Sequence, residues 1–70
     1  MDTLDLRELS PPEPLERVLR EVETRPPGAI FCVVLRHEPH PLLPLLRQAG
    51  CTWRGEPIDG GYKLTITTAP

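Results

Sequence analysis

The sequence predicts an α+β fold, a two-layer sandwich in which a four-stranded mixed sheet carries both helices on one face. Three observations predict this fold. Strand-like segments alternate with two segments of helical spacing, in the order βαβαββ. Only a tight turn separates the last two strands, so they form a hairpin. A parallel βαβ crossover is right-handed, and successive crossovers can place their helices on the same side of the sheet.

The size and charge of the chain limit its function. Seventy residues form a single domain over residues 1–70, and the composition is that of a globular protein. The net charge of −2 has both signs interspersed, so we expect no nucleic-acid partner. The chain has no apolar run long enough for a bilayer and does not begin like a signal peptide, so we expect a cytoplasmic protein without a membrane partner.

The first strand and the first helix meet at a proline-rich corner. Leu4 and Leu6 alternate with polar residues over 3–7, as in a half-buried strand. Ser10 and Glu13 have the spacing of a capping box, which predicts the start of a helix. Helical spacing of apolar residues continues this helix until it stops near the TRPPG segment, through Leu15, Val18, Leu19 and Val22.

The next segment is the most apolar in the chain. Residues 29–35, AIFCVVL, read as a central strand between two others. Both of its faces are apolar, so one face leaves a stripe on the open side of the sheet. This stripe is either shielded by long side chains such as Arg7 and Lys63 or serves as a docking surface, and we favour shielding. The two faces consist of Ile30, Cys32 and Val34 on one side and of Phe31, Val33 and Leu35 on the other.

The remaining segments complete the pattern. The HEPHP segment is a turn, and Pro41 suits the first position of a short helix that ends before Gly50. Pro44 then lies in the first turn of this helix, where a proline is tolerated. Residues 51–58 form an irregular strand, DGG a tight turn, and YKLTITT an alternating strand with Tyr62, Leu64 and Ile66 inward.

The segment LDLRELSPPEP resembles the start of the TusA (SirA-like) family of small sulfur-carrier proteins, whose signature LDxxGLxCPxP leads from a strand into a helix. The resemblance in element order covers the whole chain. It implies a cysteine at the helix N-terminus that carries a persulfide, but Pro11 occupies that position here. Pro12 and Pro14 match the two family prolines. PPEP with HEPHPLLPLL is more similar to a sister branch that lacks the carrier cysteine and has no established activity.

The proline corner is either a rigid helix cap or a docking site, and we expect the site, if there is one, beyond the carboxyl ends of the strands. The corner and the HEPHP loop both lie at strand-to-helix junctions, hence at one end of the sheet. We therefore expect one patch for interaction or ligand binding, made of Ser10, Pro11, Pro12, Glu13, Pro14, His37, Glu38 and His40.

The histidines and cysteines offer two alternatives. His37 and His40, with Glu38 between them, are weak candidates for a metal or cofactor site, because a closed zinc site needs four ligands. Cys32 lies in mid-strand and is expected to be inert, whereas Cys51, near a surface turn, is the better candidate thiol for a sulfur relay or redox role.

Our leading hypothesis is an accessory or interaction module without enzymatic activity, catalytic residues or a cofactor. Nothing in the sequence combines a nucleophile with a base and an orienting group. We expect a protein partner, and a chain that is a monomer or a weak homodimer.

Overall fold

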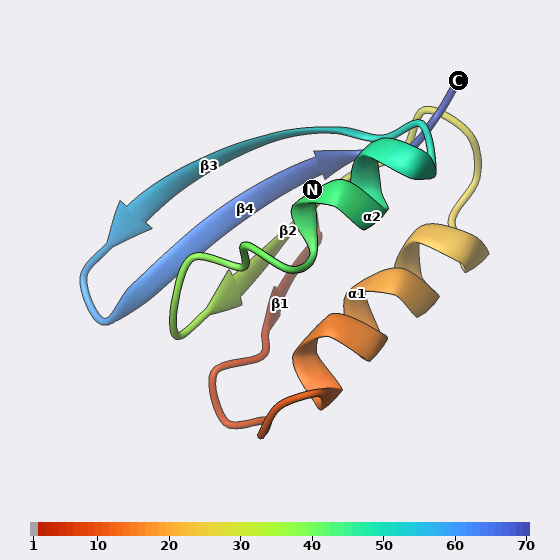
Figure 1. Cartoon of the computed structure of the whole chain (residues 1–70). Coiled ribbons are helices and arrows are strands. Elements are labelled where there is room, and N and C mark those ends of the chain that lie inside the picture. Colours follow the sequence, from red (N-terminus) through yellow and green to blue (C-terminus); the bar gives the residue numbers. More distant parts are fainter. Residues whose placement is uncertain (1) are drawn as a thin grey trace.

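The computed structural model describes residues 2–70 and has the predicted element order (Figure 1). The strands are β1 (Asp2–Asp5), β2 (Ile30–Leu35), β3 (Thr52–Ile58) and β4 (Gly61–Thr67). The helices are α1 (Glu13–Thr24) and α2 (Leu43–Gln48). Together they form the predicted α+β fold with a four-stranded mixed sheet.

The strands follow the order β1-β2-β4-β3 across the sheet. β1 pairs parallel with β2, whereas β4 pairs antiparallel with both β2 and β3. Both helices lie over the same face of the sheet (Figure 1). Because β1 and β2 are parallel, their carboxyl ends lie at the same end of the sheet. Each of these strand ends leads into a helix.

The core lies between the helices and the sheet. Alternate residues of β2 and β4 face the helices and are almost fully buried. Val18 of α1 and Leu46 of α2 pack against them, both with no exposed surface. Burying a side chain of this size contributes about 1.5–3 kcal/mol, so these contacts hold the layers together. The buried strand residues are Phe31, Val33, Leu35, Leu64 and Ile66.

The open face of the sheet is mostly polar. Cys32 and Val34 of β2 point toward it and are nonetheless buried. Cys32 lies between Thr3 and Thr65 in the register, and its Sγ is 3.4 Å from Thr65 Oγ1. These two positions agree with the expectation that the apolar stripe is shielded. Ile30, at the start of the strand, is 50% exposed.

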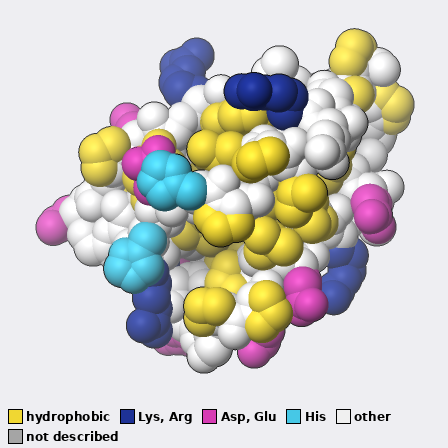
Figure 2. All heavy atoms as spheres, in the orientation of Figure 1, with side chains coloured by type: hydrophobic (Ala, Val, Ile, Leu, Met, Phe, Trp, Pro, Cys, Tyr) yellow, Lys and Arg dark blue, Asp and Glu magenta, His cyan; other side chains and the backbone are white. Residues whose placement is uncertain are grey.

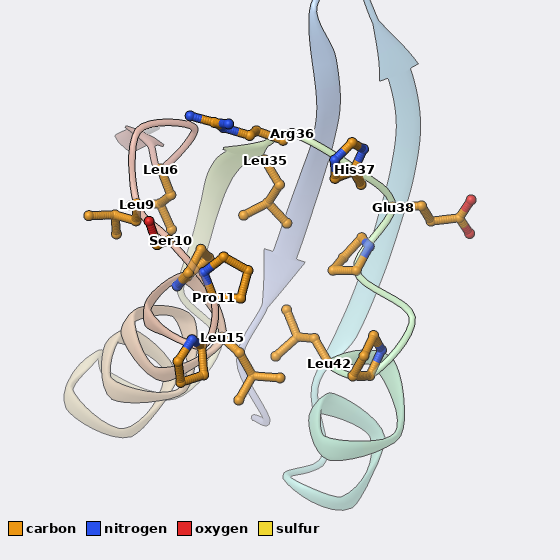
Figure 3. A pocket seen from close by; sticks show the side chains of 14 residues that line it. Leu6, Leu9, Ser10, Pro11, Leu15, Leu35, Arg36, His37, Glu38 and Leu42 are labelled. Atoms are coloured by element: carbon orange, nitrogen blue, oxygen red, sulfur yellow. The ribbon is translucent and has the colours of Figure 1, made fainter.

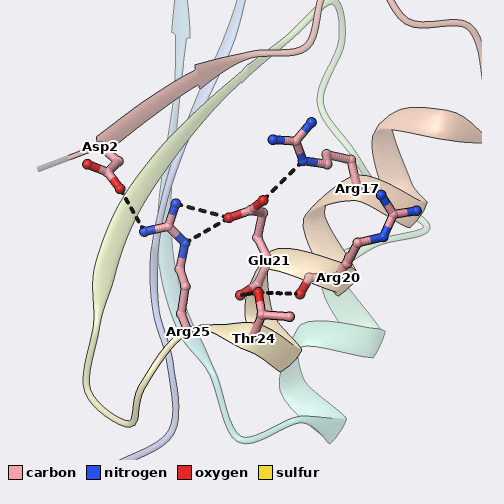
Figure 4. A network of polar contacts seen from close by, with 6 residues as sticks. All are labelled: Asp2, Arg17, Arg20, Glu21, Thr24 and Arg25. Atoms are coloured by element: carbon pink, nitrogen blue, oxygen red, sulfur yellow. Dashed lines mark hydrogen bonds and ion pairs between the residues drawn. The ribbon is translucent and has the colours of Figure 1, made fainter.

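Arg25, just after α1, ties the helix to the edge of the sheet (Figure 4). Its Nη1 lies 3.0 Å from Asp2 Oδ2, and its Nη2 lies 3.0 Å from Glu21 Oε1. Its guanidinium carbon lies 4.3 Å from the centre of the Phe31 ring. Arg17 donates to the other oxygen of Glu21 at 3.1 Å. Hydrogen bonds from Arg17 and Arg25 lower the pKa of Glu21 below its usual range.

Three expected details are corrected by the structure. The first strand ends at Asp5, because Arg7 turns back to bond with the Asp5 carboxylate. α1 has no capping box: Pro12 is its N-cap residue, no side chain caps it, and Ser10 lies too far before the helix. Pro41 lies in a turn before α2, which begins at Leu43.

One other expected detail, the glycine after the second helix, is confirmed. Gly50 has a φ of +78° directly after α2, the left-handed conformation that glycine adopts at helix ends. Gly55 of β3 is required by packing, because an added Cβ would lie 2.3 Å from Tyr62 Oη. Within residues 2–70, neither helix has the length and apolar character that a membrane crossing requires.

We predict that Glu21→Gln reduces stability most at neutral pH. The charged form of Glu21 is favoured in the folded state, so its contribution is present above the pKa of the unfolded chain and is lost as the pH falls through the lowered folded value. We expect a free energy of unfolding about 1 kcal/mol below wild type at pH 7. This difference should shrink toward zero near pH 2, as measured by urea unfolding.

The matched control for this experiment is Glu23→Gln, because Glu23 is exposed on the same helix. The control should change stability little at either pH. A Glu21→Gln effect of equal size at both pH values would contradict the assignment, since a packing defect does not depend on the charge of Glu21.

Candidate functional site

A groove lies where the two strand-to-helix loops meet, with a volume of about 480 Å³ (Figure 3). One wall comes from the loop between β1 and α1, and the other from the loop between β2 and α2. Leucine side chains form the floor, and prolines from both loops surround it. In the face-on view, hydrophobic side chains gather between the helices and both histidines lie at the margin of this area (Figure 2). The apolar lining consists of Leu6, Leu9, Pro11, Pro12, Pro14, Leu15, Leu35, Pro39, Pro41 and Leu42.

The parallel pairing of β1 and β2 places these loops side by side. The Leu6 N–H continues the pairing beyond β1 and donates to the Val34 carbonyl at 2.9 Å. The two loops then diverge, one toward α1 and the other toward α2, and the groove opens between them (Figure 3). Its position is therefore a direct consequence of the sheet topology, as the rule for strand carboxyl ends predicts.

Six of the eight residues expected in one patch line this groove: Ser10, Pro11, Pro12, Pro14, His37 and Glu38. The expectation that the two loops adjoin is therefore met. Glu13 and His40 are the exceptions. Glu13 lines a second, smaller hollow of about 220 Å³ together with Arg17 and Arg20, and the His40 side chain is 75% exposed. Glu13, Glu16, Arg17 and Arg20 recur at helical spacing and therefore share one side of α1, which is not the side that faces the groove.

A short polar network braces the first wall. The Asp5 carboxylate accepts hydrogen bonds from Arg7 Nη2 at 2.7 Å, from Arg7 Nε at 2.9 Å and from the Arg7 backbone N–H at 3.1 Å. These bonds from Arg7 lower the pKa of Asp5 to about 2. Arg36 Nε donates to the Arg7 carbonyl, which joins the first wall to the second. The bend that follows β1 is thus held by contacts to both loops.

Prolines replace hydrogen-bond donors around the groove. Pro12 and Pro14, at the start of α1, have no N–H, and the Glu13 N–H donates to the Ser10 carbonyl at 2.9 Å. At the other wall, the Leu42 N–H donates to the Pro39 carbonyl at 3.0 Å. The N-termini of helices usually offer several unpaired donors to an anion. Here few backbone donors remain for a ligand, so the centre of the groove suits an apolar group better than an anion.

The histidines do not converge with other ligands. His40 Nε2 lies 3.8 Å from Glu38 Oε1, and the carboxylate of Glu38, a residue at the margin of the groove, points away from it (Figure 3). No group of three or more His, Cys, Asp or Glu side chains within residues 2–70 is placed to hold a metal ion.

Both cysteines are buried, on opposite sides of the sheet. Cys32 is 2% exposed below the open face, and Cys51 is 5% exposed within the core. The expectation that Cys51 lies near the surface is therefore corrected: its N–H donates to the Leu46 carbonyl, which turns the chain inward after α2. A buried thiol is poorly accessible to a sulfur donor.

Sequence reasoning missed part of the lining. Arg36, Pro39 and the leucines of the floor were not assigned to the patch, although all of them line the groove. For Arg36 a signal was available, because it directly follows the apolar strand and precedes the HEPHP turn. The leucines carried no separate signal, because apolar residues of the core and of the groove floor follow the same pattern along the sequence.

Comparison with known proteins gives a family without a described function. The matching family covers residues 3–68 and is described as "Uncharacterized conserved protein (DUF2249)", so the chain belongs to this family. No curated protein and no solved structure matches the chain.

We predict that Arg7→Gln raises the pKa of Asp5 from about 2 toward the ordinary value of about 3.9, because the carboxylate loses its charged donor. The titration can be followed by the carboxyl ¹³C chemical shift of Asp5 between pH 1.5 and 6. The control, Arg17→Gln, removes an arginine of the same charge from α1 and should leave Asp5 unchanged. Equal titration of Asp5 in wild type and Arg7→Gln would show that Arg7 does not brace this bend.

Proposed function

We propose that this DUF2249 chain is an accessory module without enzymatic activity, and that its groove binds an apolar side chain presented by a protein partner. The observation that carries the proposal is the groove itself, about 480 Å³ of space lined by leucine and proline side chains from two loops. Pockets that bind a specific group commonly have volumes of about 300–1,000 Å³ and a mostly apolar lining.

The absence of donors at the proline corner supports an apolar occupant. A buried donor without a partner costs free energy, so a lining rich in N–H groups selects ligands that can accept hydrogen bonds. Pro11, Pro12 and Pro14 present only carbon atoms at their ring faces. A leucine-like side chain could displace water from this surface without leaving a protein donor unsatisfied.

The margin of the groove supports a protein rather than a wholly apolar molecule. Arg36, His37 and Ser10 line its edge and are exposed. An apolar centre with a polar margin is the usual anatomy of a protein interface. These polar groups could bond to the backbone of the partner segment, while its side chain occupies the groove.

The resemblance to the sulfur-carrier family gives this proposal a rationale. Pro11 stands at the position that matches the carrier cysteine and lines the groove. A proline side chain cannot carry a persulfide. We therefore propose a TusA-like module that keeps the docking corner and has lost sulfur transfer.

We include a cytoplasmic location in the proposal. Its support is the position of the two thiols, which lie buried on opposite sides of the sheet. A fold with this arrangement gains nothing from an oxidising compartment, because no disulfide between Cys32 and Cys51 could form across the sheet.

The test uses capped amino acids as probes and the leucine methyl groups as reporters. We predict that N-acetyl-leucine methylamide shifts the methyl signals of Leu9, Leu15 and Leu42 in ¹H-¹³C spectra with millimolar affinity. N-acetyl-aspartate methylamide should shift them at least several-fold less at the same concentration, because the leucine and proline side chains at the centre of the groove offer a carboxylate no donor.

Two variants at one exposed position make this test specific. His37→Asp adds a carboxylate at the margin of the groove and should reduce the affinity for the leucine probe several-fold. His37→Leu adds apolar surface and should keep or strengthen its binding. Equal shifts with both probes, or equal binding by both variants, would refute the proposal.

A further inference from the structure

The sheet ends in a long strand whose outer edge has no neighbour. In the part of the chain that the structure describes, β3 is the last strand in the order β1-β2-β4-β3 and pairs only with β4 (Figure 1). It has seven residues, and all of them except Trp53 are exposed. An unpaired edge of this length is a template for another strand.

The hairpin geometry determines which backbone groups of β3 point outward. Only Asp59 and Gly60 connect β3 with β4, so the flanking residues Ile58 and Gly61 form a hydrogen-bonded pair. Backbone groups alternate in direction along a strand. Trp53, Gly55 and Pro57 therefore direct their N–H or C=O groups away from β4.

Two opposite charges flank the middle of this edge. Arg54 and Glu56 are exposed on the open face of the sheet, one on each side of Gly55. Lys63 lies opposite Glu56 in the register, yet no ion pair within residues 2–70 involves Arg54 or Glu56. Both charges remain available to a second chain.

In one antiparallel register, the charges of one β3 strand lie opposite the opposite charges of a second copy. When two β3 strands pair about a two-fold axis through Gly55, Arg54 of each copy lies opposite Glu56 of the other. These are non-hydrogen-bonded positions, at which side chains of neighbouring strands come closest. A register centred on Arg54 places two arginines opposite each other, and one centred on Glu56 places two glutamates opposite each other. Opposite charges at facing positions stabilise a strand pair, whereas like charges destabilise it.

We propose that two copies of this chain form a homodimer by antiparallel pairing of their β3 edges, centred on Gly55. The facing glycines exchange backbone hydrogen bonds, and the Trp53 N–H of each copy donates to the Pro57 carbonyl of the other. The other edge of the sheet offers a shorter pairing, because β1 has four residues and β3 has seven. The inference is independent of the proposed function of the groove.

Proline and charged residues at an edge commonly prevent strand pairing. Here Pro57 removes only one outward donor from the edge. The charges destabilise the registers centred on Arg54 and on Glu56, in which like charges face each other. They stabilise the register centred on Gly55. The same residues that block a general strand addition therefore select one specific partner strand.

The test is sedimentation equilibrium of single and mixed charge variants. Arg54→Glu and Glu56→Arg should each weaken dimerisation about tenfold or more, because every facing pair becomes a pair of like charges. The double variant Arg54→Glu/Glu56→Arg should restore the wild-type dissociation constant. A mixture of the two single variants should form heterodimers, since the glutamates of one then face the arginines of the other.

The control is Arg20→Glu, which makes the same change of charge at an exposed position of α1 and should leave the dimer unchanged. Circular dichroism of each variant verifies that it is folded. A wild-type chain that stays monomeric up to about 1 mM would overturn the proposal. So would a dimer with equal stability in all variants, or single variants that fail to associate with each other.

Discussion

The parallel pairing of β1 with β2 is the contact on which the rest of the structure depends. It joins the first strand to the most buried strand of the chain, whose Phe31 and Val33 have no exposed surface. Because the pairing is parallel, both strands end at the same end of the sheet, and the two loops that follow them lie side by side there. An antiparallel pair would have separated these loops by the length of the sheet. The position of the groove therefore depends on the topology of the sheet and not on the particular side chains that line it.

Two separate interactions stabilise this arrangement, one at each end of β1. Arg25 joins the end of α1 to β1 through Asp2 and lies over the Phe31 ring. At the opposite end of β1, Asp5 and Arg7 hold the bend, and Arg36 connects that bend to the second loop. The prolines then restrict the backbone of the corner by fixing φ, which limits the conformations from which the groove must be formed. A groove that is largely formed before binding reduces the entropy lost when a ligand enters.

The fold could be predicted from the sequence because its signals are local. The two-residue period of YKLTITT, the apolar run of AIFCVVL and the glycine after α2 each identify an element without reference to the others. The helix starts were harder, because proline fixes φ at several neighbouring positions and the true N-cap, Pro12, has no capping side chain. Likewise, the burial of Cys51 depends on the turn of the chain after α2, which depends on packing and has no sequence signature.

The meeting of the two loops could be predicted from topology, but the chemistry of the groove could not. Topology shows which loops adjoin, whereas the direction of each side chain depends on the phase of the helix and the path of the loop. This explains why Pro12 and Pro14 line the groove while Glu13 does not, and why Glu38 points outward. Arg36 has two roles at once, as part of the groove margin and as the donor that links the two loops.

We propose that the apolar surface used for binding is this groove. Intermolecular nuclear Overhauser effects between the isobutyl group of a leucine probe and the methyl groups of the protein would locate the bound side chain. We expect contacts to Leu15 and Leu42. Contacts confined to Ile30 and Ile58, the large hydrophobic side chains exposed elsewhere on the surface, would contradict the proposal.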